Sequence, residues 1–273
     1  MKDGLAGTLP IGEAIALAKA GGYQGLELAI AGQGVLTPQT IQTECEAIRG
    51  KIDASDLVVE TLASGLSWTV NPVSDDPEIR EKSLELHVAA LERAAWLGCQ
   101  AMLFVPGVVS GPFAQTPIRY DHALARLREI IKPLLDVADR VGVDLCMENV
   151  WNGLFYSPLE LADFIDSFNS PKLGVYLDVG NLMGYHQHPP HWIEILGKRI
   201  KRVHVKDFVN SYARSGGYHF CDIGSGQLPW DDTMAGLKAI GYDSTIVCEV
   251  LPWDASLLAR NSVAMDQILG RKA

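Results

Sequence analysis

The sequence lacks the features that mark membrane, secreted or nucleic-acid-binding proteins. No apolar run approaches the roughly 20 residues needed to cross a bilayer, and the N-terminus has no apolar signal-peptide core. Acidic residues outnumber basic ones by 33 to 23, giving a formal net charge of −10 at pH 7. Nucleic-acid binding normally needs a basic face. We therefore expect a cytoplasmic protein whose partners are neither membranes nor nucleic acids.

Cysteines are few, and the sequence has no low-complexity linker. The five cysteines are an odd number, widely scattered, with no Cys-x-x-Cys pair, which indicates reduced thiols rather than a disulfide framework. The 273 residues are 48% hydrophobic and 21% charged, so the chain can bury a large core. We expect one domain over residues 1–273.

Short apolar segments alternate with longer amphipathic ones. Helical spacing of apolar residues predicts helices at Ile11–Ala20, Pro77–Leu97 and Pro117–Val141. Strands that alternate with helices in one unbroken run indicate an α/β fold, the (β/α)8 TIM barrel. The expected strands are Gly25–Ile30, Leu57–Ser64, Ala101–Gly107, Asp144–Val150, Leu173–Gly180, Ile200–Phe208 and Ser244–Leu251.

The first strand of such a barrel is the exception. Met1–Pro10 is short and polar, so the helix Ile11–Ala20 follows almost nothing. We expect either a stub at Lys2–Ala6 or a degenerate or missing first strand. Because an open barrel edge can pair with another chain, we also expect a homo-oligomer or a covering N-terminal segment.

Four expected strands end on a side chain that can bind a metal ion. In a barrel the carboxyl ends of the strands carry the chemistry, and alternation along each strand turns these four side chains inward. Buried carboxylates are costly unless a cation or hydrogen bonds compensate them. A mixed oxygen and nitrogen set suits one divalent ion such as Mn²⁺, Zn²⁺, Co²⁺ or Mg²⁺; the alternative is four buried polar groups joined by salt bridges. The residues are Glu148, Asp178, His204 and Glu249.

Other side chains could contact a substrate or a second ion. Trp68, Trp151 and Trp253 follow strands and could line a substrate site or simply pack. The inward-facing Glu27 could touch substrate or fill the barrel interior. Lys206, with the Gly-Ser-Gly turn at residues 224–226, could receive a phosphate, although such turns are a weak signal. The histidines of the His186–His191 run resemble a metal cluster, but its two prolines favour an irregular lid loop.

Three motifs carry a family resemblance: Leu177–Asn181 (Leu-Asp-Val-Gly-Asn), Val203–Asp207 (Val-His-Val-Lys-Asp), and Ile223–Gly226 with Trp230. With them the chain resembles the xylose-isomerase-like sugar phosphate isomerases and epimerases, which include tagatose/psicose 3-epimerases, pentulose-phosphate 3-epimerases and inosose-processing enzymes. The resemblance implies a TIM barrel with one catalytic divalent metal held by the four strand-end residues, whose two glutamates also handle the proton. Asn181 stands where tagatose-type epimerases carry histidine, and an asparagine at this position is closer to the phosphosugar members. We count Asn181 among the substrate-binding candidates.

Such a site predicts an isomerase or epimerase of carbohydrate metabolism that acts on a sugar or sugar phosphate. A proton is removed beside a carbonyl, and the metal stabilises the enediolate as a Lewis acid. Two carboxylates on opposite faces give epimerisation, whereas one base that relays the proton gives isomerisation; the sequence leaves both open. An inosose-type dehydratase on the same metal site is the main alternative. A metal-dependent endonuclease conflicts with the net charge of −10, and a non-catalytic sugar-binding protein conflicts with the intact four-residue set.

Overall fold

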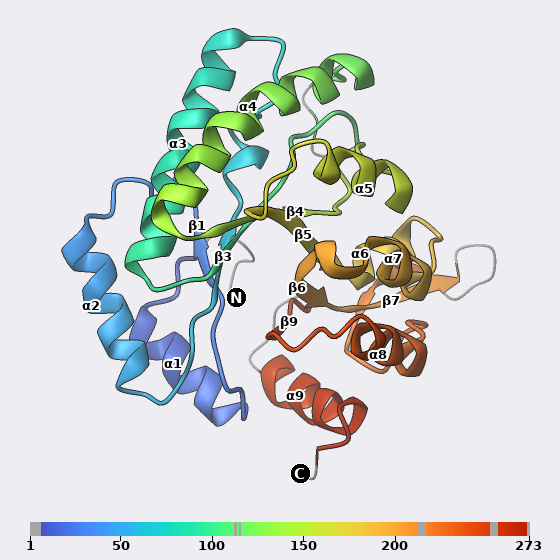
Figure 1. Ribbon diagram of the computed structural model, residues 1–273. Coiled ribbons are helices and arrows are strands. Elements are labelled where there is room, and N and C mark those ends of the chain that lie inside the picture. Colours follow the sequence, from blue (N-terminus) through green and yellow to red (C-terminus); the bar gives the residue numbers. More distant parts are fainter. Residues whose placement is uncertain (1–6, 112–113, 115, 212–216, 252–255, 272–273) are drawn as a thin grey trace.

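Parallel strands lie at the centre of the molecule and helices surround them (Figure 1). The computed structural model describes residues 7–111, 114, 116–211, 217–251 and 256–271. Within them one parallel sheet has the strand order β1-β2-β3-β4-β5-β6-β9. The strands are β1 (Leu28–Ile30), β2 (Thr61–Ser64), β3 (Ala101–Phe104), β4 (Asp144–Glu148), β5 (Leu173–Asp178), β6 (Ile200–Val205) and β9 (Ile246–Cys248). All seven expected strands are present, and the sheet curls into an incomplete barrel.

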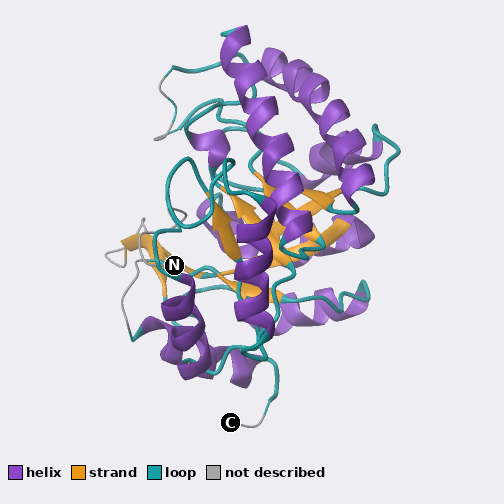
Figure 2. Cartoon of the chain, turned by 90° about the vertical axis from the view of Figure 1, so that its left-hand side faces the viewer, coloured by secondary structure: helices purple, strands orange, loops and turns teal. Residues whose placement is uncertain are grey.

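The helices cover the outside of the curled sheet (Figure 2). The expected α1 has the predicted bounds, and α3 ends one residue early. The second long helix begins at Tyr120 rather than Pro117, because Arg119 is extended and the Ile118 N–H donates to the Val109 carbonyl. No helix in the described ranges is long and apolar enough to span a membrane. The helices are α1 (Ile11–Ala20), α2 (Gln42–Asp53), α3 (Pro77–Trp96), α4 (Tyr120–Val141), α5 (Pro158–Asp166), α6 (Val179–Gly184), α7 (Pro189–Leu196), α8 (Trp230–Ala239) and α9 (Leu257–Ile268).

The hydrophobic core has two layers that follow the alternation of the strands. Met147, Val203 and Val205 belong to the large cluster between sheet and helices. Cys146 and Tyr176 belong to a smaller cluster inside the barrel. The expected inward and outward faces are therefore confirmed. All five cysteines are free, as the sequence predicts.

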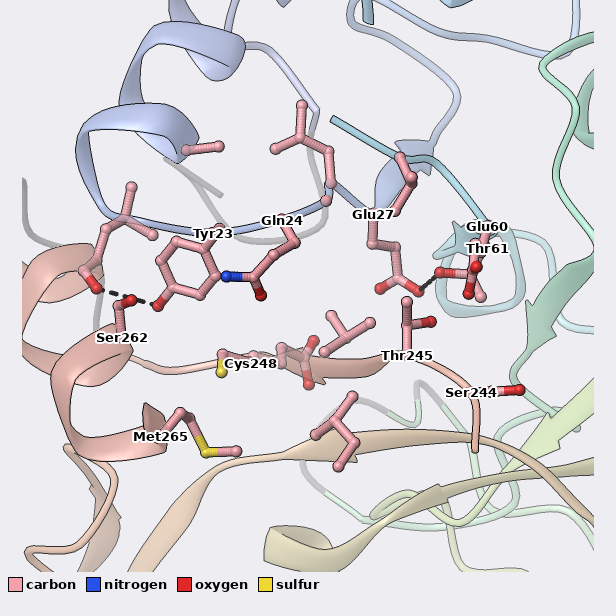
Figure 3. Close-up of a pocket in the computed structure, with 18 of the residues that line it drawn as sticks. Tyr23, Gln24, Glu27, Glu60, Thr61, Ser244, Thr245, Cys248, Ser262 and Met265 are labelled. Atoms are coloured by element: carbon pink, nitrogen blue, oxygen red, sulfur yellow. Dashed lines mark hydrogen bonds between the residues drawn. The ribbon is translucent and has the colours of Figure 1, made fainter. Parts of the chain in front are cut away.

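In the described part of the chain, the barrel wall is open between β1 and β9. These two strands end the sheet, and a cavity of about 1110 Å³ lies between them, α1 and α9 (Figure 3). No described strand fills this position, which agrees with the expected weakness of the first strand. The stub expected at Lys2–Ala6 lies outside the described residues.

Two expectations are wrong in detail. The strand expected at Ile200–Phe208 is divided: β6 ends at Val205, and β7 (Asp207–Ser211) pairs antiparallel with β8 (Gly217–Cys221). The chain leaves the sheet because the buried Asp207 carboxylate accepts hydrogen bonds from the turn that precedes α8. The segment expected as an irregular lid contains the start of α7, since Pro189 occupies the first helical turn, where its missing N–H costs nothing.

Candidate metal centre

Four side chains from neighbouring strands converge at the carboxyl end of the barrel. Glu148, Asp178 and His204 lie on β4, β5 and β6. Glu249 follows β9, where its N–H donates to the Val205 carbonyl. One ligand atom from each residue lies within 4.8 Å of all the others. The expected convergence of these four side chains is confirmed.

The geometry of this cluster fits one divalent ion. Carboxylate and imidazole ligands lie about 2.0–2.2 Å from such an ion, so ligands on opposite sides are about 4.4 Å apart. The observed spread of 4.8 Å requires little adjustment. The His204 Nδ1 atom is buried without a hydrogen-bond partner, and it lies 3.5 Å from Glu148 Oε1 and 3.7 Å from Glu249 Oε2. A buried nitrogen that faces two carboxylates in this way is well placed to bind a cation.

Lys206 supplies a positive charge inside the same cluster. Its Nζ atom lies 2.7 Å from Asp178 Oδ2 and 2.5 Å from Glu249 Oε2, and its side chain is 5% exposed. The ammonium also lies 5.0 Å from the centre of the Phe220 ring. Burial opposes the charged form, but Asp178 and Glu249 outweigh it and raise the pKa of Lys206. The lysine is thus a permanent cation beside two of the four candidate ligands.

The two glutamates have opposite proton affinities. Burial raises the pKa of Glu148 to about 7, despite its contact with His204. Burial also opposes ionisation of Glu249, but Lys206 and His204 outweigh it and lower the pKa of Glu249 to about 2. At neutral pH Glu249 is therefore ionised, while Glu148 is close to half protonated. Two carboxyl groups with separated pKa values are typical of acid–base sites.

Carboxylates also control the charge of His204. Burial alone would lower its pKa, but Glu27, Glu148 and Glu249 together raise it well above the usual value. Before a cation binds, the imidazole is therefore protonated at neutral pH.

Asn149 and Asn181 hold the backbone around Asp178. Asn149 Oδ1 accepts from the Asp178 N–H, and its Nδ2 donates to the Asp178 carbonyl. Asn181 donates through Nδ2 to the Asn149 carbonyl at 3.0 Å, and its own N–H donates to Asp178 Oδ1 at 2.9 Å. The side-chain amide of Asn181 is thus engaged by the protein, and substrate contact by this residue stays a prediction.

The tryptophan candidates have different surroundings. Trp151 stacks on Phe220 with ring centres 5.0 Å apart, and its Nε1 donates to the Asn181 carbonyl. Trp68 ends a short 3₁₀ helix after β2 and packs, half-buried, beside the inner barrel cluster. Both lie after strands at the carboxyl side, so their proposed contact with a sugar stays open. Trp253 lies outside the described residues.

The Gly-Ser-Gly turn is a structural feature rather than a free phosphate cradle. The amides of Gly224 and Gly226 both donate to Asp207 Oδ2 at 3.0 Å. A Cβ atom at Gly226 would collide with this carboxylate. The glycine therefore allows the turn to approach Asp207, and the amides that a phosphate would need are already bonded.

The histidine run after α6 forms no metal cluster. His188 and His191 face each other with ring centres 4.6 Å apart, whereas His186 Nδ1 accepts from Asn210 Nδ2. Among the described residues the four strand-end side chains are the only group with the spacing of metal ligands. His87 is a core residue: it is fully buried, and its Nδ1 donates to the Ser83 carbonyl at 2.8 Å.

Sequence reasoning missed three residues that support the site. Asn149 lies one residue after a ligand, and only its bonds to Asp178 reveal its role. Thr61 and Tyr176 both donate to Glu27 Oε1, at 2.7 and 2.6 Å. Alternation along β5 would have turned Tyr176 inward with Asp178, two residues later, which is the one signal that could have identified it.

Two relatives with assigned activities match part of the chain. The chain is 30% identical over 145 residues to a 3-oxo-isoapionate decarboxylase of Pectobacterium atrosepticum, a match that covers 50% of this chain and 48% of the relative. It is 25% identical over 177 residues to an L-ribulose-5-phosphate 3-epimerase of Salmonella paratyphi C, covering 65% of this chain and 59% of the relative. Both matches thus span less than two thirds of the relatives' lengths.

Solved structures share the fold over almost the whole chain. A D-psicose 3-epimerase of Clostridium cellulolyticum H10, solved with D-tagatose, superposes with a TM-score of 0.79 at 19% identity, covering 94% of this chain and 92% of that one. The family described as xylose isomerase-like TIM barrel matches residues 15–264. This chain is a member of the xylose isomerase-like TIM-barrel family.

Proposed function

We propose that the chain is a metal-dependent isomerase or 3-epimerase of a ketose or ketose phosphate, located in the cytoplasm. The observation that carries the proposal is the convergence of Glu148, Asp178, His204 and Glu249 within 4.8 Å. These residues would hold one divalent ion. When bound, the ion would act as a Lewis acid toward the substrate oxygens and so favour the enediolate formed beside the carbonyl.

The two glutamates supply the proton transfer. Glu249, ionised at neutral pH, is suited to accept a proton from the carbon beside the carbonyl. Glu148, the other carboxylate of the site, would supply the proton that replaces it. If the two act on opposite faces of the substrate, the carbon is inverted; if one performs both transfers, the carbonyl moves.

Other side chains shape the surroundings of the reaction. Lys206 contacts both Asp178 and Glu249; it helps to lower the pKa of Glu249, whereas burial raises the pKa of Asp178 in spite of the lysine. Trp151, stacked on Phe220, offers an aromatic surface near the Lys206 ammonium, which contacts the same Phe220 ring. Aromatic faces suit the apolar side of a sugar ring or chain. We include Trp68, Trp151, Asn181 and Lys206 as the substrate-facing set of this proposal.

Decarboxylation of a keto sugar acid is a second candidate. The 30% identity to the 3-oxo-isoapionate decarboxylase favours it. Loss of carbon dioxide beside a carbonyl also leaves negative charge on the adjacent oxygen, so the same ligand set would serve. Only the group lost from carbon differs, carbon dioxide instead of a proton.

A substrate panel tests the proposal. Free ketoses, ketose phosphates, inososes and 3-keto sugar acids are incubated in D₂O with protein loaded with Mn²⁺, and products are followed by NMR. Epimerisation with deuterium on the inverted carbon supports the proposal. Loss of water or of carbon dioxide, or no reaction with any ketose, contradicts it.

A further inference from the structure

Glu27 lies inside the barrel and contacts the candidate ligand His204. It precedes β1, and its Oε2 lies 2.7 Å from His204 Nε2. The glutamate side chain is 8% exposed and the imidazole 1% exposed. A contact this short between two buried groups fixes which nitrogen keeps its proton when the imidazole is neutral. Because a carboxylate accepts hydrogen bonds, Nε2 is the donor.

The second oxygen of Glu27 is held from two other strands. Thr61 Oγ1 on β2 donates to Oε1 at 2.7 Å, a bond drawn in Figure 3. Tyr176 on β5 donates to the same atom at 2.6 Å, and its ring packs on His204 with centres 4.3 Å apart. Both oxygens of the carboxylate are therefore engaged by protein donors, so its orientation is set before any ligand arrives.

The far side of the imidazole faces the candidate ion. With Nε2 bonded to Glu27, the atom left for coordination is Nδ1, which has no hydrogen-bond partner and faces Glu148 and Glu249. A carboxylate that accepts from the outer nitrogen of a metal-binding histidine fixes the ring and makes the inner nitrogen a stronger ligand.

We propose that Glu27 is a positioning residue that directs His204 Nδ1 to the metal, with Thr61 and Tyr176 orienting its carboxylate. The inference rests on the metal site of the proposed function. It assigns Glu27 to the protein's own site rather than to substrate, because no oxygen of its side chain lacks a protein donor.

Glu27→Gln tests the charge while preserving the shape. The amide oxygen can still accept from His204 Nε2, and the amide NH₂ can face the two hydroxyl oxygens. Glu60→Gln is the matched control, since Glu60 lines the same cavity (Figure 3) and is not among the ligand residues. Circular dichroism and thermal unfolding without metal verify that each variant is folded.

The first readout is the affinity for Mn²⁺, measured by calorimetry without substrate. Loss of such an outer carboxylate typically weakens metal binding about 10–100-fold. We expect that loss in Glu27→Gln, a smaller loss in Thr61→Val, and wild-type affinity in Glu60→Gln. Wild-type affinity in Glu27→Gln would overturn the inference.

The second readout is the nitrogen that binds the metal, which a purely structural role would not determine. In ¹⁵N-histidine-labelled protein loaded with Zn²⁺, the resonances of His204, assigned with His204→Gln, should show a protonated Nε2 and a metal-bound Nδ1. Zinc on Nε2 would refute the assignment. Wild-type protein that binds Mn²⁺ but turns over no ketose would contradict the proposed function and leave both readouts valid.

Discussion

The proton affinities at the metal centre predict that metal binding is strongly pH-dependent. A metal binds the deprotonated forms of its ligands, so each proton on a ligand competes with the ion. Before the ion binds, His204 is protonated at neutral pH because its carboxylate neighbours raise its pKa. Glu148, with a pKa of about 7, is partly protonated. Lowering the pH should therefore weaken binding twice, once through each residue.

The size of the effect follows from these two groups. At a pH below the pKa of a ligand, protonation of that ligand weakens the apparent affinity for the metal about tenfold per pH unit, which is about 1.4 kcal/mol. Between pH 8 and pH 6, Glu148 alone contributes about tenfold, and His204 adds to the loss because its pKa is raised, so the Kd for Mn²⁺ should rise by more than about tenfold. Glu249 adds nothing in this range because its pKa is about 2.

Calorimetry in buffers of different ionisation enthalpy measures both the Kd and the protons released. We expect about one more proton released per ion at pH 6 than at pH 8, because Glu148 is protonated at the lower pH. Glu148→Gln should remove this difference. An affinity that is equal at pH 6 and pH 8, or binding without proton release, would refute this account of the ligands.

Three further predictions concern catalysis, stability and assembly. With saturating metal, Glu249→Gln should still bind substrate, but its rate should fall about 10²–10⁴-fold, measured as exchange of the substrate α-proton with D₂O. Glu148→Gln should lose rate in the same way if two bases act, and normal turnover in both variants would contradict the mechanism. Burial lowers the pKa of His87 to about 4, below the value of about 6.5 in the unfolded chain. The neutral, buried His87 therefore contributes fully to the free energy of unfolding above pH 6.5, and about 3 kcal/mol of that free energy should be lost as the pH falls to 4. Urea unfolding measures this loss, and an equally steep decline in His87→Gln would contradict it. The edges that β1 and β9 form in the described sheet predict a homo-oligomer in analytical ultracentrifugation, and a monomer at all concentrations would contradict this prediction.

The candidate ligands could be predicted because a strand has a period of two. Glu148 sits two residues beyond the inward-facing Cys146, so the apolar pattern gave its side as well as its position. The same reasoning placed Asp178, His204 and Glu249, and the structure brings all four together. Local sequence was sufficient here because each strand carries its own ligand.

Features that depend on contacts between distant segments could not be predicted in this way. The role of Glu27 depends on Thr61, Tyr176 and His204, which lie on three different strands. Nothing beside Glu27 in the sequence indicates these partners. The turn between β6 and β7 likewise depends on Asp207 bonding to amides some twenty residues later. Periodicity alone extended that strand through Phe208.

Anomalous scattering from crystals grown with Mn²⁺ tests whether the four strand-end residues bind one metal ion. We predict one anomalous peak, about 2.2 Å from a carboxylate oxygen of Glu148, Asp178 and Glu249 and from Nδ1 of His204. A centre without a peak, or an ion held mainly by His186, His188 and His191, would contradict it.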